Sequence, residues 1–261
     1  MNKKIVLKEI IARLSVEPKC WEEVINEKRE ICLLITFCNP YSVFLGRSDP
    51  HYLQMLGCFN YVFADGILLA HVGHHFNCSV ERLSFDGNSL APYIFSLARK
   101  HNKKFYLIGG RQGVAEQAAS ILSCSCHINI VGCSHGYMDS DEQGLSVIEK
   151  VIQSGADIVL CGMGAPKQEE FLLKFRSAEW TGVAFTCGGY LDQVVKANCH
   201  QYYPVWVNKL NIRALYRLMK EPKRLFKRYF YEYIPFMVEL VRIVSWGSKK
   251  GMAQPKRGRG L

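Results

Sequence analysis

The chain has 261 residues, of which 49% are hydrophobic, and it carries 33 Lys and Arg against 23 Asp and Glu. This length and composition suffice for a sizeable core and exclude a disordered or fibrous protein. No uncharged apolar run reaches the roughly eighteen residues that a spanning helix needs, and Lys8 and Glu9 interrupt the N-terminal one. We therefore expect a cytoplasmic protein without a transmembrane segment or signal peptide.

The eleven cysteines include no Cys-x-x-Cys pair. Four of them, Cys32, Cys38, Cys161 and Cys187, lie inside apolar runs, which indicates buried thiols rather than disulfides or zinc ligands.

Apolar runs alternate with amphipathic stretches along most of the chain. The runs predict strands over residues 31–37, 61–64, 105–108, 128–131, 158–161 and 183–187, and the amphipathic stretches predict helices over 18–28, 89–101, 113–122, 142–153 and 167–175. This alternation predicts a Rossmann-like α/β fold, a parallel sheet with helices on both faces. Such folds bind ligands outside the carboxyl ends of the strands, so the residues that follow each strand are the candidate site.

Glycine is frequent at these strand ends. The candidates are Gly109, Gly110, Gly164, Gly188 and Gly189. Glycine lets backbone N–H groups approach a phosphate closely, and a helix that begins directly afterwards adds the positive end of its dipole. One glycine pair after a strand is commonly only a tight turn, whereas several in one sheet favour a nucleotide-type ligand.

Polar residues at the same ends allow two interpretations each. Asp65 follows the second strand, where it either faces the crevice or caps the next helix. Thr36 and Asn39 either hydrogen-bond a sugar or begin a turn at Asn39-Pro40. In the stretch from Pro166 to Glu170, proline and acidic residues suit the start of a helix, which leaves Lys167 and Gln168 as the ligand candidates.

An Asp-x-Asp pattern occurs at Asp139 and Asp141. Although this pattern holds divalent metals in many transferases, it directly precedes the helix predicted over 142–153. We therefore interpret it as a helix cap and expect no metal site.

Positive charge is concentrated near the C-terminus. Residues 206–261 hold 14 of the 33 basic but 3 of the 23 acidic side chains, a local charge of +11, which leaves −1 for residues 1–205. Large apolar residues accompany the charge over 229–246, as in a helix lying in a membrane interface or one packed on the domain. We expect a basic helical appendage over 206–246 and a disordered basic tail over 247–261.

Several motifs occur together in a distinctive order. They are Thr36…Asn39, Ala64-Asp65-Gly66, Glu81-Arg82, Phe105 to Gly110, His135-Gly136-Tyr137, Gly164 to Glu169, Gly188-Gly189…Asp192 and Leu215-Tyr216-Arg217-Leu218…Glu221-Pro222…Arg224…Arg228-Tyr229. In this order the chain resembles the WecG/TagA/CpsF family of bacterial glycosyltransferases.

The resemblance implies an activity. Family members transfer a hexose, often N-acetylmannosamine, from a UDP-sugar to a polyprenyl-diphosphate-linked sugar at the cytoplasmic face of the inner membrane. They do so with inversion and without a metal or other cofactor, in the synthesis of surface polysaccharides such as capsule, exopolysaccharide or lipopolysaccharide. Residues 1–205 would then be the catalytic domain that binds the UDP-sugar, and residues 206–246 would close the site against the membrane surface.

The resemblance also assigns residues. Asp65 becomes the general base, while Arg217, Arg224 and either Lys227 or Arg228 stabilise the leaving diphosphate. The substrate-binding set is Thr36, Asn39, Arg82, Gly109, Gly110, Tyr137, Gly164, Lys167, Gln168, Gly188 and Gly189. The chain departs from the family pattern at Arg82-Leu83-Ser84-Phe85-Asp86-Gly87, so the sequence leaves open whether Asp86 replaces a displaced acid. Donor, acceptor, linkage, pathway and oligomeric state, a homo-oligomer included, also stay open.

Two other functions are compatible with parts of the sequence. An NAD-dependent oxidoreductase is disfavoured because no Gly-x-Gly-x-x-Gly follows the first strand. The alternative to a transferase is a non-enzymatic membrane or nucleic-acid binding module that uses the basic C-terminal segment. For the transferase we expect no nucleic-acid partner.

Overall fold

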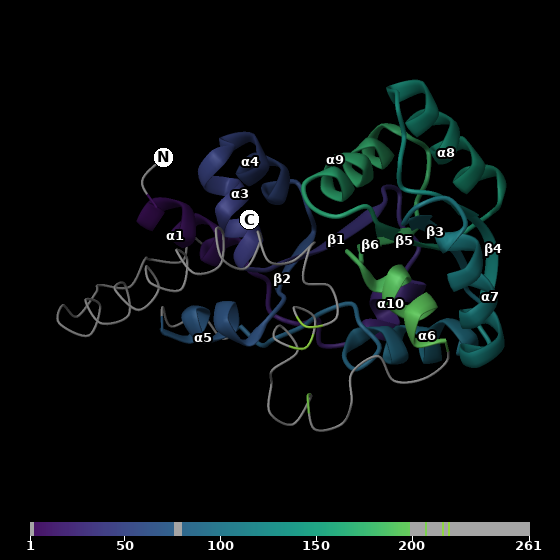
Figure 1. Ribbon diagram of the computed structural model, residues 1–261, viewed down its shortest axis with the longest axis horizontal. Helices are drawn as coiled ribbons and strands as arrows, with labels where there is room; N and C mark the ends of the chain where they lie inside the picture. The colour runs from purple at the N-terminus through teal and green to yellow at the C-terminus, as the bar shows by residue number, and fades with distance from the viewer. Residues whose placement is uncertain (1–2, 76–79, 199–206, 208–215, 217–218, 220–261) are drawn as a thin grey trace.

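The computed structural model describes residues 3–75 and 80–198, together with residues 207, 216 and 219 (Figure 1). Within these residues six strands form one sheet, and all neighbouring strands are parallel. They are β1 (Leu33–Cys38), β2 (Tyr61–Ala64), β3 (Lys104–Gly109), β4 (Asn129–Ser134), β5 (Ile158–Gly162) and β6 (Val183–Thr186). Their order across the sheet is β2-β1-β6-β5-β3-β4.

Helices cover both faces of the sheet. One face packs against α1 (Lys3–Arg13), α3 (Pro40–Ser48), α4 (Pro50–Gly57), α5 (Ile67–His75), α8 (Asp141–Gln153) and α9 (Lys167–Leu173), which continues as the 3-10 turn Lys174–Ser177. The other face packs against α2 (Trp21–Asn26), α6 (Leu90–Lys100), α7 (Val114–Cys126) and α10 (Tyr190–Ala197). Figure 1 shows α8 and α9 above the sheet and α6 and α10 below it. The Rossmann-like α/β prediction is confirmed.

Strand side chains alternate between the two core clusters. In β1, Leu34 and Cys38 belong to the cluster between the sheet and helices α3 and α9. Ile35 and Phe37 belong to the cluster on the other face, between the sheet and helices α6 and α10. Because both faces of the sheet are covered, the strands other than the edge strand β4 read as nearly continuous apolar runs, which is why they could be predicted, whereas no residue of β4 is fully buried. The predicted ends differ from the observed ones by at most three residues.

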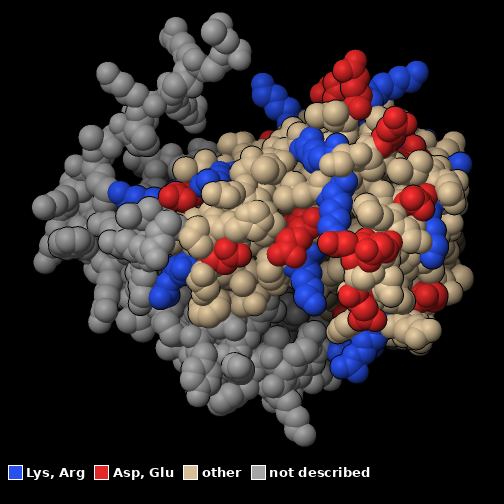
Figure 2. Space-filling view, turned by 90° about the horizontal axis from the view of Figure 1, so that it is seen from above, with Lys and Arg blue, Asp and Glu red and all other residues tan. Residues whose placement is uncertain are grey.

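Opposite charges are mixed on the face drawn in Figure 2, which looks down from the side of α8 and α9. Among the described residues, one ion pair joins Lys174 to Asp141 on the side of α8 and α9, and another joins Lys100 of α6 to Glu22 of α2, on the opposite side of the sheet, at 2.8 Å. This mixture agrees with the nearly neutral charge of residues 1–205. The predicted appendage and tail lie outside the described residues, apart from residues 207, 216 and 219. None of the described helices has the length and apolarity to cross a bilayer.

Candidate active site

The carboxyl ends of the parallel strands lie along one edge of the sheet, and the chain leaves β1 and β6 in opposite directions. After β1 it enters α3 on one face, and after β6 it enters α10 on the other. Strands β1 and β6 are neighbours, so their ends form a topological switch point, the place where open α/β sheets bind ligands.

Two threonines stand side by side at this switch point. Ile35 of β1 pairs with Phe185 of β6, which makes Thr36 and Thr186 the next residues in register. Their hydroxyl oxygens are 2.9 Å apart, and both side chains are buried. Thr36 is fully buried, so its hydroxyl acts inside the protein and not on the surface of the crevice.

Helix α9 brings a carboxylate onto the threonine pair. The Thr36 hydroxyl donates to Oε1 of Glu169 at 2.9 Å, and Nε2 of Gln168 donates to the same oxygen at 3.0 Å. Since Thr36 gives its only hydroxyl proton to Glu169, the Thr186 hydroxyl donates to Thr36. One hydrogen-bond chain therefore links β6, β1 and α9.

Glu169 is fully buried, and its Oε2 has no hydrogen-bond partner among the described residues. Burial raises the pKa of this carboxyl to about 7, against the lowering effect of the hydrogen bonds from Gln168 and Thr36. This corrects the interpretation from sequence, in which the acidic residues after Pro166 only suited a helix start. A buried carboxyl that titrates near neutral pH at a ligand-binding edge is typical of functional sites.

Gln168 joins two of the glycine loops. Its Oε1 accepts hydrogen bonds from the N–H of Gly164, after β5, and from the N–H of Gly188, after β6, each at 3.2 Å. Both glycines have left-handed backbones, with φ of +79° and +52°, and no described atom lies within 4 Å of where a Cβ would stand. These two N–H groups already donate to Gln168, so they are not available to a ligand. What the two glycines provide is open space beside the backbone.

The glycines after β3 have a packing role. A Cβ on Gly109 would lie 2.6 Å from the carbonyl oxygen of Gly162, and one on Gly110 would lie 2.5 Å from Val114. Close contact between β3, β5 and α7 therefore requires glycine at both positions, a packing role that differs from the tight turn considered from the sequence. Their predicted contact with substrate stays a prediction.

Asp65 lies at the ends of β2 and β1. Its N–H donates to the carbonyl of Cys38 at 2.7 Å, which places it beside Asn39 at the start of α3. Asn39 caps that helix: its Oδ1 accepts from the N–H groups of Tyr41 and Ser42 at 2.9 and 3.4 Å. The side-chain N–H groups of Asn39 are thus what it can present to a ligand.

Arg82 flanks the outer side of β2. It forms a parallel bridge with Ala64, and its guanidinium lies 3.6 Å from Oδ2 of Asp86. The same Oδ2 accepts from the Ser84 hydroxyl at 2.7 Å. Asp86 therefore orients Arg82 next to β2, the strand that Asp65 directly follows, and the sequence alone could not establish this relationship.

The remaining predicted residues lie elsewhere. Tyr137 follows β4 at the opposite edge of the sheet from Asp65 and is 61% exposed. Lys167 is exposed at the start of α9, and Gly189 precedes α10. Arg217, Arg224, Lys227 and Arg228 lie outside the described residues.

The Asp-x-Asp segment serves α8. Ser140 is the N-cap, and its hydroxyl accepts from the N–H of Gln143 at 3.3 Å. Asp141 lies in the first turn and pairs with Lys174. The cap interpretation is confirmed. Across residues 3–75 and 80–198, no group of three or more His, Cys, Asp or Glu side chains is placed to hold a metal ion.

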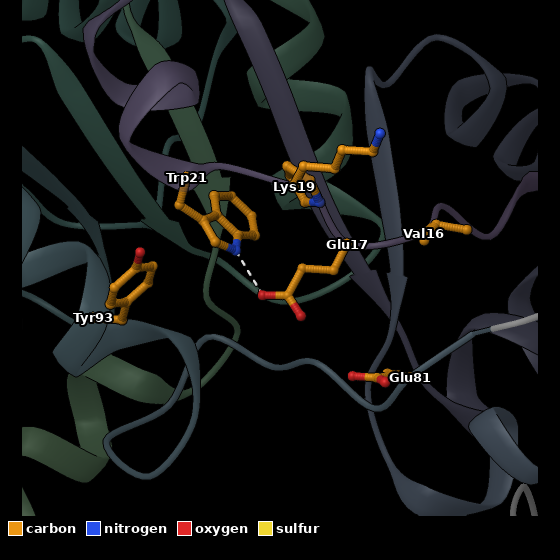
Figure 3. Close-up of a pocket in the computed structure, with 7 residues that line it drawn as sticks. Val16, Glu17, Lys19, Trp21, Glu81 and Tyr93 are labelled. Carbon is orange, nitrogen blue, oxygen red and sulfur yellow. Dashed lines mark hydrogen bonds between the residues drawn. The ribbon is translucent and has the colours of Figure 1, made fainter.

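A separate cavity of about 590 Å³ opens beside the outer edge of β2. Figure 3 shows the rings of Trp21 and Tyr93 at one side, with the carboxylate of Glu17 accepting from the Trp21 indole N–H at 2.7 Å. Glu81 also lines the cavity, next in sequence to Arg82. The cavity therefore adjoins the edge that carries Arg82 but does not contain the Thr36 network.

Sequence reasoning missed Thr186 and Glu169. A usable signal existed for Thr186, since Thr36 and Thr186 are isolated polar residues near the carboxyl ends of two apolar strands. The motif from Gly164 to Glu169 includes Glu169 and leaves out Glu170, but composition and spacing do not show that Glu169 is buried while Glu170 is exposed.

Comparison with known proteins gives the class. The model of the Glycosyl transferase WecG/TagA/CpsF family matches residues 9–250. The UDP-Gal:alpha-D-GlcNAc-diphosphoundecaprenol beta-1,4-galactosyltransferase of Shigella boydii is 33% identical over 217 residues, 82% of this chain and 88% of that protein. The N-acetylglucosaminyldiphosphoundecaprenol N-acetyl-beta-D-mannosaminyltransferase of Bacillus subtilis (strain 168) is 26% identical over 197 residues, 75% of each chain.

The fold and the matches together define a glycosyltransferase with a Rossmann-like sheet. The chain belongs to the WecG/TagA/CpsF family, as the sequence motifs indicated.

Proposed function

We propose that this enzyme transfers a hexose from a UDP-sugar to a polyprenyl-diphosphate-linked sugar, with inversion and without a metal ion. The observation that carries the proposal is the position of Asp65, whose N–H is bonded to the end of β1 next to the switch point. The acceptors in the names of both relatives are sugars on diphosphoundecaprenol, which supports a lipid-linked acceptor here.

Donor binding is assigned to the loops after β5 and β6, beside the switch point. The open space at Gly164 and Gly188 accommodates the diphosphate of a UDP-sugar between the loops after β5 and β6. We favour UDP-galactose over UDP-N-acetylmannosamine, because the galactosyltransferase is the more similar of the two relatives. Both relatives are named for beta-linked transfer, and UDP-hexoses commonly carry an alpha linkage, which supports inversion.

Asp65 acts as the general base in this proposal. Its carboxylate takes the proton of the attacking acceptor hydroxyl as that oxygen bonds to the anomeric carbon. The bond between that carbon and the diphosphate oxygen breaks on the opposite face, and UDP leaves with the electron pair. Such proton transfer contributes about 10²- to 10⁴-fold in rate.

The departing diphosphate needs positive charge. We assign this task to Arg217, Arg224 and either Lys227 or Arg228, which belong to the basic segment 206–246. Guanidinium groups that pair with the diphosphate can take the place that a divalent cation has in other transferases.

The same segment supports peripheral binding to the cytoplasmic face of the membrane, where a lipid-linked acceptor would be reached. Its charge suits anionic headgroups, and its apolar residues suit the interface. Removal of residues 206–261 should abolish sedimentation with anionic vesicles, and unchanged sedimentation would refute this role.

A transfer assay tests the function. The full chain is incubated with GlcNAc-diphosphate on a short polyprenyl chain and with UDP-galactose, UDP-N-acetylmannosamine or UDP-glucose, and the product linkage is read by NMR. We expect a beta-linked disaccharide from UDP-galactose. If no UDP-hexose is consumed and UDP does not raise the melting temperature, the proposal is wrong. Membership of an enzyme family already argues against the non-enzymatic binding module.

A further inference from the structure

We propose that Glu169 is the positioning residue of the donor site: its Oε1 fixes the Thr36 hydroxyl and the Gln168 amide, and through Gln168 it holds the glycine loops after β5 and β6. The inference rests on the proposed function, because the loops matter as the place where the nucleotide diphosphate lies. It adds a residue that the motif resemblance did not assign.

The Gln168 amide has one favourable orientation in this network. Its nitrogen faces Oε1 of Glu169 at 3.0 Å, and its oxygen faces the N–H groups of Gly164 and Gly188 at 3.2 Å. In the flipped orientation the amide nitrogen would face two N–H donors, and the amide oxygen would face a carboxylate. Glu169 and the two glycines therefore select a single orientation of the Gln168 amide. If the Glu169 carboxylate is removed, the amide is no longer held in that orientation from both ends.

Residue 169 carries a buried acid where a neutral side chain would also fit. A glutamine at position 169 would offer a carbonyl oxygen to the same two donors, Thr36 and Gln168, without the cost of burying a carboxylate. The side chain is nonetheless an acid that is fully buried, with Oε2 unpartnered among the described residues. An ionised acceptor makes both hydrogen bonds stronger, so the charge serves to hold Thr36 and Gln168.

Glu169 can change charge near neutral pH while its buried neighbours stay neutral. Elements packed against it bring close Cys38 from β1, Cys161 from β5 and Tyr52 from α4, and Glu170 is adjacent in sequence. Burial raises the pKa of both thiols and of the phenol far from neutrality. Burial also brings the pKa of Glu169 to about 7, so its protonation weakens the network around that pH.

The experiment compares wild type with Glu169→Gln, Glu169→Ala and the control Glu170→Gln, which changes an exposed neighbour. With UDP-galactose, we expect kcat/KM of the Ala variant to fall about tenfold or more, mainly through KM of the donor. Below about pH 7, kcat/KM of wild type and of Glu170→Gln should decline with falling pH. The Gln variant is neutral at every pH, so it should lack that decline and should show at pH 8 the lowered kcat/KM that wild type reaches only when Glu169 is protonated.

Hydrogen exchange gives a readout that does not depend on turnover. Amides in segments 163–165 and 187–189 should exchange faster in Glu169→Ala than in wild type. In Glu170→Gln they should exchange as slowly as in wild type. If wild type transfers no sugar, the proposed function fails, and this comparison still tests the positioning role. Equal exchange in all variants, or an unchanged donor KM in Glu169→Ala, overturns the inference. If the Ala variant does not fold, a Gln variant that keeps the decline below pH 7 overturns it.

Discussion

The Thr36 hydroxyl and the Glu169 carboxylate, 133 residues apart in sequence, meet at 2.9 Å where β1, β6 and α9 converge. The contact is buried, so it does not touch substrate itself. It fixes the ends of the two strands between which the crevice opens. The partly exposed residues around this point, among them Asp65 and the glycine loops, are thus held by a rigid buried network.

Replacement of Asp65 by Asn should abolish transfer while the fold is retained. Asn keeps the shape of the side chain but cannot take the acceptor proton, so we expect a loss of about 10²- to 10⁴-fold in kcat. Turnover of UDP-galactose and the melting temperature are measured together. Glu149→Gln, which removes an exposed acid from α8, is the control and should be fully active. Near-normal turnover by Asp65→Asn would refute the assignment of the base.

Removal of divalent metal should leave activity unchanged, because the basic side chains of segment 206–246 are assigned to the leaving diphosphate. Turnover is measured after dialysis against EDTA and again with added Mn²⁺. Asp139→Asn should behave like wild type in both conditions. Strict dependence on Mn²⁺ that disappears in Asp139→Asn would revive the Asp-x-Asp segment as a metal site.

Glu169 should make stability depend on pH in a defined direction. Burial raises the folded-state pKa from 4.5 to about 7, so between these values the folded protein holds a proton that the unfolded chain has lost. The contribution of Glu169 to stability is therefore greatest below about pH 4.5 and falls as the pH rises through 7, by up to about 3 kcal/mol at about 1.4 kcal/mol per pKa unit. Urea unfolding should show Glu169→Gln gaining stability relative to wild type between pH 5 and pH 8. A difference independent of pH would contradict the raised pKa.

Gly109→Ala should destabilise the protein by about 2 kcal/mol or more. Gly109 has φ of +150°, and the added Cβ would lie 2.6 Å from the carbonyl oxygen of Gly162. Gly87→Ala is the matched control, because no described atom lies within 4 Å of its Cβ position, and it should change stability by less than about 0.5 kcal/mol. If both substitutions change the free energy of unfolding equally in chemical denaturation, the close approach of β3 and β5 does not account for the need for glycine at position 109.

The sequence permits prediction of the strands but not of their arrangement. Each strand is an apolar run, whereas the order β2-β1-β6-β5-β3-β4 depends on packing between distant segments. Helix α3 was missed because Asn39-Pro40 also suits a turn, although Asn39 and Ser42 form a capping box there. Asp65 and Gln168 were found through the motif order, while the burial of Glu169 depends on tertiary contacts that a first-turn glutamate does not reveal.

A crystal structure of the full chain with UDP is the most direct test of the account. We predict that the diphosphate lies between residues 163–166 and 187–189, with the Asp65 carboxylate on the side from which an acceptor would approach. UDP bound instead in the cavity beside Trp21 and Tyr93, away from the ends of β5 and β6, would contradict it.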